Sequence, residues 1–119
     1  MRQGDKFLGG REVHGENHLW IVLNEPAGHG DIALIVNVST LRPNAETTCI
    51  LEPGEHPFIT RDSYVRYGSA RRADAADLAE ALRNGLLKPH RATTKAFLEK
   101  VRAGAKASPF LAEELRALL

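Results

Sequence analysis

Histidine is the residue type in this chain best suited to acid–base chemistry, because its ordinary pKa lies closest to neutrality. Two of the five histidines lie where strands are expected to begin or turns to end. His18 begins an apolar stretch and shares a strand face with Trp20, and His56 follows a turn rich in glycine and proline. We interpret His18 and His56 as a candidate acid–base pair. We expect the other histidines at the surface: His14, His29 and His90.

Hydroxyl and guanidinium groups directly follow the most apolar segment of the chain. Ser39, Thr40 and Arg42 stand there and could bind a phosphate group. With the two histidines they would form a metal-free site in which RNA is cleaved by its own 2′-hydroxyl. In this hypothesis His18, Thr40 and His56 are catalytic, and Ser39 and Arg42 bind RNA. In the alternative interpretation, the hydroxyls cap a turn and the histidines hydrogen-bond to loops.

An arginine-rich segment is the second candidate feature. Four arginines fall within twelve residues: Arg61, Arg66, Arg71 and Arg72. Such a strip either faces phosphates or forms a solvated edge. Tyr64 and Tyr67 are three residues apart on one expected strand, so we expect one of them to point outward, where it could contact a base. We select Arg61, Arg66 and Tyr67 as candidate RNA-binding residues.

Other kinds of site have no motif in the sequence. Cys49 is the single cysteine, which excludes an internal disulfide and a cysteine-based zinc site, and we expect it to be buried. The sequence contains no paired-histidine zinc motif, acidic calcium loop, serine elbow or phosphate-binding glycine loop. Two histidines with Asp31 or Glu16 could converge on a metal, but no spacing specifies this. We predict neither a metal site nor a cofactor.

Length and composition predict one domain spanning residues 1–119. Hydrophobic residues make up 43% of the 119 residues and charged residues 26%, which suits a single buried core. The net charge of +1 does not by itself indicate a nucleic-acid binder. The polar first residues and the absence of an apolar run near ~20 residues predict no signal peptide and no membrane span, so we expect a cytoplasmic protein.

The pattern of the chain changes near residue 70, from short β-branched runs to segments rich in Ala, Leu, Arg and Glu. Two glycines in the turn at 27–31 favour a hairpin between its flanking strands. Ser108 and Pro109 resemble the N-cap and first position of a helix. The predicted strands cover residues 6–8, 18–24, 32–38, 47–51 and 63–67, with an extended segment at 56–59, and the predicted helices cover 74–84, 93–105 and a segment from 108 onward.

These elements predict an α+β fold. Short strands joined by turns must protect their edges, and either a small β-barrel or a strongly twisted antiparallel sheet achieves this. We expect this β part in residues 1–70 and a helical tail in residues 71–119, which packs on the sheet, on itself or on a second subunit.

The order of these pieces resembles the PemK/MazF-like family of toxins. The matching pieces are residues 4–5, 18–23, 36–40 and 63–65, within about residues 4–67. The resemblance implies an SH3-like barrel that usually dimerises, cleaves single-stranded RNA without a metal and is neutralised by an antitoxin. The family's catalytic Ser/Thr falls near Ser39 or Thr40. The family commonly has a catalytic arginine in an Arg-Pro pair near the position of His18, where no such pair occurs. Either His18 replaces that arginine or activity is lost.

Three functions therefore remain as hypotheses. The leading one is a toxin-like, metal-independent endoribonuclease, whose partners would be single-stranded RNA, a cognate antitoxin and a second copy of the chain. The second is a non-catalytic module on an SH3-like barrel that binds protein or nucleic acid through the arginine strip and the helices. The third is a structural or phage-derived interaction protein without chemistry.

Overall fold

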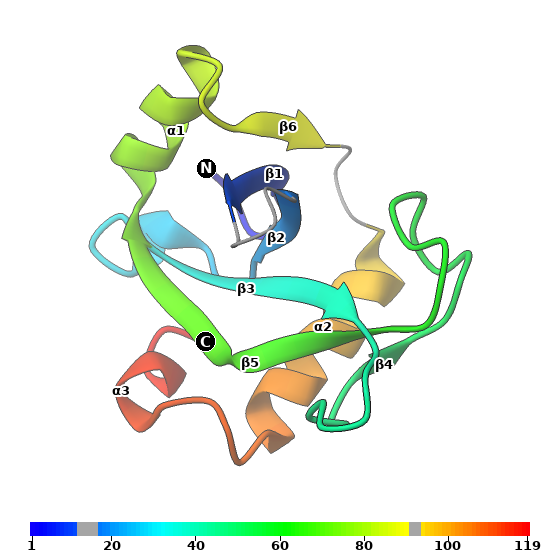
Figure 1. The fold of residues 1–119 in the computed structure, drawn as a ribbon. Coiled ribbons are helices and arrows are strands. Elements are labelled where there is room, and N and C mark those ends of the chain that lie inside the picture. The colour runs from blue at the N-terminus through cyan, green and yellow to red at the C-terminus, as the bar shows by residue number, and fades with distance from the viewer. Residues whose placement is uncertain (12–16, 91–93) are drawn as a thin grey trace.

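A curled antiparallel sheet is the centre of the fold (Figure 1). The computed structural model describes residues 1–11, 17–90 and 94–119. Within these ranges the sheet has six strands in the order β4-β5-β3-β2-β1-β6, and every neighbouring pair is antiparallel. The strands are β1 (Lys6–Arg11), β2 (Asn17–Val22), β3 (Ile32–Thr40), β4 (Ile50–Leu51), β5 (Ser63–Asp74) and β6 (Lys88–His90).

Helices follow and flank this sheet, which confirms the predicted α+β fold. They are α1 (Ala75–Arg83), α2 (Lys95–Ala107) and α3 (Glu113–Arg116), with a short 3-10 turn η1 (Pro26–Gly28) between β2 and β3. In Figure 1, α2 lies on the other side of β3 from α1. No helix in the described ranges combines the length and the apolar character that a bilayer crossing requires.

The pleat of β3 divides the interior into two apolar clusters, because successive side chains of a strand point to opposite faces. Leu34, Val36 and Val38 belong to the larger cluster, on the side of α2 and α3. Ala33 and Ile35 belong to a smaller cluster, against which α1 packs. Both faces of β3 are therefore covered along its first seven residues, which explains why this is the most apolar segment of the chain.

Helix α2 closes the larger cluster with residues spaced four apart. Phe97, Val101 and Ala105 form one buried stripe of the helix. The helix begins where the Thr94 hydroxyl accepts a hydrogen bond from the Phe97 N–H at 3.2 Å. The buried hydroxyl of Tyr67 on β5 donates to the Val101 carbonyl oxygen at 2.7 Å, so one polar contact joins helix and sheet inside the apolar cluster.

An irregularity in β5 separates its two halves. Asn37 on β3 pairs with Arg66, but Ile35, two residues away, pairs with Arg71, so β5 carries extra residues at this point. The carboxylate of Glu46 accepts hydrogen bonds from two backbone N–H groups of this bulge, those of residues 67 and 68, at 2.9 and 3.0 Å. The bulge therefore keeps its backbone donors satisfied without a partner strand.

Most predicted strands are confirmed with changed bounds, and β2 and β3 form the predicted hairpin. In place of the strand predicted at 47–51, the structure has the shorter strand β4. The β part does not end at residue 70, because β5 continues to Asp74 and β6 follows α1. The segment at 56–59 is a turn rather than an extended segment, closed by the Ile59 N–H bonded to the His56 carbonyl at 2.9 Å.

The prediction of a helix starting at Ser108 is wrong. Ser108 ends α2, and its hydroxyl accepts a hydrogen bond from the Phe110 N–H at 3.0 Å, which stabilises a turn. Helix α3 starts only at Glu113. The predicted start of the preceding helix, Thr93, lies outside the described residues. Strand β6 was not predicted, because its sequence Lys-Pro-His has neither β-branched residues nor alternation.

We expect Gly104→Ala to destabilise the protein by about 2–4 kcal/mol. A Cβ atom at position 104 would lie 2.2 Å from the Tyr67 hydroxyl oxygen and 3.1 Å from the Cβ atom of Cys49. The Tyr67 ring must then move and lose its hydrogen bond to α2. Urea unfolding measures the effect. Gly28→Ala is the matched control, because no described atom lies within 4 Å of its added Cβ; equal losses in both variants would contradict the close contact.

Candidate functional site

One face of the sheet changes from apolar to polar along β3. After Ala33 and Ile35, the same face carries Asn37 and Ser39. Directly opposite partners of an antiparallel pair share a face, so Arg66 joins Asn37 and Tyr64 joins Ser39. His18 lies on this face too, because it is two residues before Trp20, the β2 partner of Asn37. We call this surface the polar face, defined by its five members: His18, Asn37, Ser39, Tyr64 and Arg66.

A cavity of about 290 Å³ lies at the end of the polar face. It brings together four residues selected from the sequence: His18, Ser39, Thr40 and Arg61. They come from β2, from the end of β3 and from the loop before β5. The remaining wall is formed by side chains or backbone of Val38, Phe58, Thr60 and Ser63. We call it the histidine cavity.

The imidazole of His18 is oriented by the backbone of β3. Its Nδ1 atom lies 3.3 Å from the Val38 carbonyl oxygen. A carbonyl oxygen only accepts, so Nδ1 carries the proton and Nε2 is the basic nitrogen of the neutral ring. This backbone contact fixes one tautomer, which a general base requires.

The Ser39 hydroxyl is the second notable group of this cavity. Its oxygen is buried and has no hydrogen-bond partner among the described residues. A buried hydroxyl in that state costs roughly 1–3 kcal/mol. A ligand oxygen that enters the cavity would remove this cost, so the cavity is suited to a polar ligand.

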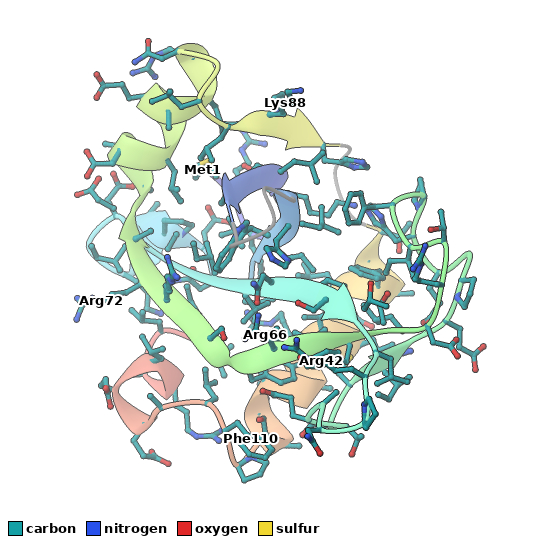
Figure 2. The ribbon with its side chains drawn as sticks, in the orientation of Figure 1. Met1, Arg42, Arg66, Arg72, Lys88 and Phe110 are labelled. Carbon is teal, nitrogen blue, oxygen red and sulfur yellow. The ribbon has the colours of Figure 1, made fainter. Side chains whose placement is uncertain are left out.

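A larger cavity of about 620 Å³ adjoins the polar face. Two predicted RNA-binding residues, Arg42 and Arg66, line it together with Tyr64, Glu46 and Phe110. Arg42 is held in place because its Nη2 atom donates to the Tyr64 hydroxyl at 3.2 Å. Figure 2 shows Arg42 and Arg66 next to each other in front of β5, with Phe110 below them. We call this the arginine cavity.

The structure does not bring His56 to the cavity that holds His18 and Thr40. His56 is only 3% exposed and lines neither cavity. Its ring packs against Phe97 of α2, at 5.4 Å between ring centroids, and against His90 of β6 at 5.0 Å. It therefore lies on the α2 side of the sheet, whereas His18 lies on the polar face. Sequence spacing could not show this, because the turn that carries His56 is long and irregular.

His56 instead contacts a buried lysine that the sequence analysis overlooked. Lys6 is 4% exposed, and its Nζ atom lies 2.5 Å from the His56 Nε2 atom. The Phe58 N–H donates to Nδ1 at 2.9 Å, so the proton of the neutral ring is on Nε2. An Nε2–H group can donate only to an amine with a free lone pair. The contact is therefore most favourable above the pKa of Lys6, where the amine is neutral.

The pKa values of both groups shift in the direction that this geometry requires. Burial lowers the pKa of Lys6 to about 8. Burial, and then the charges of Lys6 and His90, lower the pKa of His56 to about 4. His56 is thus neutral at pH 7 and cannot serve as the general acid of the proposed pair.

Tyr67, which was selected as an RNA-binding residue, lies in the larger apolar cluster. Tyr67 is 1% exposed and donates its hydroxyl to α2, so it offers no surface for stacking. Tyr64 is on the opposite face, but it is buried as well, because Arg42 and the segment after β3 cover it. The expectation that one of these two tyrosines is exposed therefore fails, although the Tyr64 hydroxyl group reaches the arginine cavity.

The arginine strip divides into separate environments. Arg61 lines the histidine cavity and Arg66 the arginine cavity, whereas Arg71 lies with its guanidinium carbon 5.4 Å from the Trp20 ring centroid. Arg72 points away from both cavities (Figure 2). The bulge in β5 causes this division. It inserts extra residues between Arg66 and Arg71, whose partners Asn37 and Ile35 are only two residues apart on β3.

The remaining histidines and acidic residues form no further site. His29 is half-buried, with Nδ1 at 3.1 Å from the Glu25 carbonyl oxygen, and His90 is half-buried beside His56. His14 and Glu16 lie outside the described residues. Within residues 1–11, 17–90 and 94–119, no group of three His, Cys, Asp or Glu side chains is arranged to hold a metal ion.

The fold and site define an α+β protein with two adjoining cavities, one lined by histidine and hydroxyls and one by arginines. No protein-family model and no curated protein matches the chain. Its function therefore has to be argued from the geometry of these cavities.

We expect the stability of this protein to rise with pH in two windows. His56 has a folded pKa of about 4 against 6.5, so the unfolded chain binds more protons between these values, and stability is lost as the pH falls from 6.5 toward 4. Lys6 has a folded pKa of about 8 against 10.5, so stability rises again as the pH passes from 8 to 10.5. Each group contributes at most ~1.4 kcal/mol per pH unit.

Urea unfolding between pH 4 and pH 10 measures this dependence. Lys6→Met removes the rise above pH 8 and weakens the loss below pH 6.5, because the pKa of His56 returns toward 6.5 without the neighbouring charge. Lys106→Met, at an exposed position of α2, is the control and keeps both windows. A wild-type stability that stays level between pH 8 and 9.5 would contradict the neutral-amine assignment.

Proposed function

We propose that this protein binds single-stranded RNA across the polar face and cleaves it in the histidine cavity without a metal ion. One observation carries the proposal: an oriented imidazole, two hydroxyl residues and an arginine converge on one cavity, although they come from separate segments. These are the group types that phosphodiester cleavage by a 2′-hydroxyl needs.

The cleavage step assigns a task to each group. Nε2 of His18 takes the proton of the ribose 2′-hydroxyl, whose oxygen then attacks the adjacent phosphorus. The bond from phosphorus to the 5′-oxygen breaks, the leaving oxygen takes a proton from water, and the proton on His18 passes to the hydroxide that remains. The products are a 2′,3′-cyclic phosphate and a 5′-hydroxyl. Arg61 offsets the negative charge of the phosphate, and the hydroxyls of Ser39 and Thr40 donate to its non-bridging oxygens.

The arginine cavity supports RNA as the substrate class. Arg42 and Arg66 add two positive charges beside the histidine cavity, as expected for a surface that follows a phosphate backbone. An RNA substrate would place the protein in the cytoplasm. The resemblance to PemK/MazF-like toxins supports the same function and is the sole basis for a cognate antitoxin and a homodimer. In this proposal His18 replaces the arginine of that family.

A non-catalytic RNA-binding module is the second candidate. The burial of His56 favours it, because His18 is then the single histidine among the described residues that line the cavity, and His56 is not there as a second proton carrier. Binding through Arg42 and Arg66 does not depend on either histidine.

The deciding experiment is incubation of the purified protein with a defined single-stranded RNA in chelator. We expect cuts that leave 2′,3′-cyclic phosphate, and we expect His18→Ala to slow them by roughly 100-fold or more while the affinity for RNA changes little. His29→Ala is the matched control, since this histidine lies in the turn around η1 and lines neither cavity.

The other outcomes separate the two candidates. Cleavage that continues unchanged in the His18→Ala variant removes the catalytic assignment. RNA binding without any cleavage, lost when Arg42 and Arg66 are both replaced by alanine, identifies the non-catalytic module. Neither binding nor cleavage of RNA by the wild-type protein ends both candidates.

A further inference from the structure

Phe110 is an exposed aromatic side chain on a rigid turn. It is 55% exposed, and its backbone N–H is bonded to the hydroxyl of Ser108, which is fully buried. The guanidinium of Arg116 donates to the carbonyl oxygens of Ala105, Lys106 and Ser108, which fastens the turn to the end of α2. The turn thus holds the ring in a fixed place at the surface.

The exposed Phe110 lies at one of the two cavities. The described part of the chain has three exposed large apolar side chains: Phe58, Leu86 and Phe110. Phe58 lines the histidine cavity and Phe110 lines the arginine cavity. Each cavity of the polar face therefore has an aromatic residue in its lining, and aromatic rings are the side chains on which bases stack.

The opposite wall of the arginine cavity is cationic. Arg42 is fixed by its bond to Tyr64, and Arg66 stands beside it (Figure 2). Glu46, the acidic residue among the described residues that line this cavity, has both carboxylate oxygens bonded to backbone N–H groups of the β5 bulge, which balances much of its charge. The wall thus favours an anionic group of a ligand.

A glycine separates the two walls. A Cβ atom on Gly68 would lie 3.3 Å from a Glu46 carboxylate oxygen and 3.7 Å from the Phe110 Cβ atom, so the backbone of β5 lies close to both residues at this point. With about 620 Å³ the cavity has room for a nucleobase and its ribose phosphate.

The two cavities are neighbours along β5. Ser63 lines the histidine cavity, and Tyr64 and Arg66 line the arginine cavity. On the polar face, Ser39 of the histidine cavity lies directly opposite Tyr64 of the arginine cavity, so the two cavities meet at this pair of strand residues. One RNA strand can therefore occupy both cavities.

We propose that the arginine cavity binds a nucleotide of single-stranded RNA that flanks the one in the histidine cavity, with the base stacked on Phe110 and the phosphate held by Arg42 and Arg66. The C-terminal segment thereby becomes part of the RNA site. This inference rests on the proposed RNA binding and does not require cleavage.

The test compares variants of the full chain in binding to a labelled single-stranded RNA. Phe110→Ala weakens binding by roughly 5- to 100-fold, the range for loss of one stacked base. Leu86→Ala is the control, because Leu86 is 78% exposed and lines neither cavity. Phe110→Trp keeps the affinity, and its indole fluorescence is quenched by RNA while the buried Trp20 is not affected.

Two further measurements separate stacking from charge. RNAs with one abasic position at a time locate the stacked base, because at that position Phe110→Ala causes no further loss. The salt dependence of binding stays as in the wild type in Phe110→Ala, whereas Arg66→Ala lowers its slope by about one unit. A thermal unfolding curve like that of the wild type shows that Phe110→Ala leaves the fold intact.

Failure of this inference differs from failure of the proposed function. If the wild-type protein binds RNA and Phe110→Ala binds like Leu86→Ala at every position, the nucleotide site is wrong and the proposed function stands. If Phe110→Ala and Leu86→Ala weaken binding equally, the effect is non-specific and the inference is likewise wrong. If the wild-type protein binds no RNA, both proposals fall.

Discussion

The alternation of side chains along β3 is the constraint on which both the core and the site depend. β3 lies between β2 and β5, and its side chains point alternately to the two faces of the sheet. Each residue must therefore suit the surroundings on one of these faces. Leu34, Val36 and Val38 require the cover of α2, whereas the other face changes from apolar to polar at Asn37. The same pleat that buries one set of residues therefore presents Ser39 beside His18. A shift of register by one residue would exchange the core and the site.

The bulge in β5 is the second determinant of the site. It places Arg66 opposite Asn37 while Arg71 contacts Trp20, so two nearby arginines serve different surroundings. Glu46 stabilises the bulge by accepting hydrogen bonds from two backbone N–H groups. A single carboxylate thus satisfies backbone donors that have no partner strand.

The sequence predicted what depends on periodicity and missed what depends on long loops. The hairpin of β2 and β3 and the apolar stripe of α2 follow from spacing alone, and the meeting of His18 with Ser39 follows from the hairpin. The burial of His56 could not be predicted, because the turn that carries it is fixed by contacts with β1, β6 and α2. Phe110 falls in the segment from residue 108 onward that was predicted to be helical, because the bond between its N–H and Ser108 makes a turn that periodicity does not show.

His56 does not line the histidine cavity, but its buried ring anchors the loop that forms part of the cavity wall. Its Nδ1 atom holds the Phe58 N–H, and Phe58 begins the loop that supplies Thr60 and Arg61 to the histidine cavity. Its Nε2 atom contacts Lys6, so the same ring joins this loop to β1. A buried amine and imidazole are costly unless each satisfies the other. The loop that carries Arg61 is therefore anchored on the far side of the sheet, and the geometry of the cavity depends on a contact that no ligand touches.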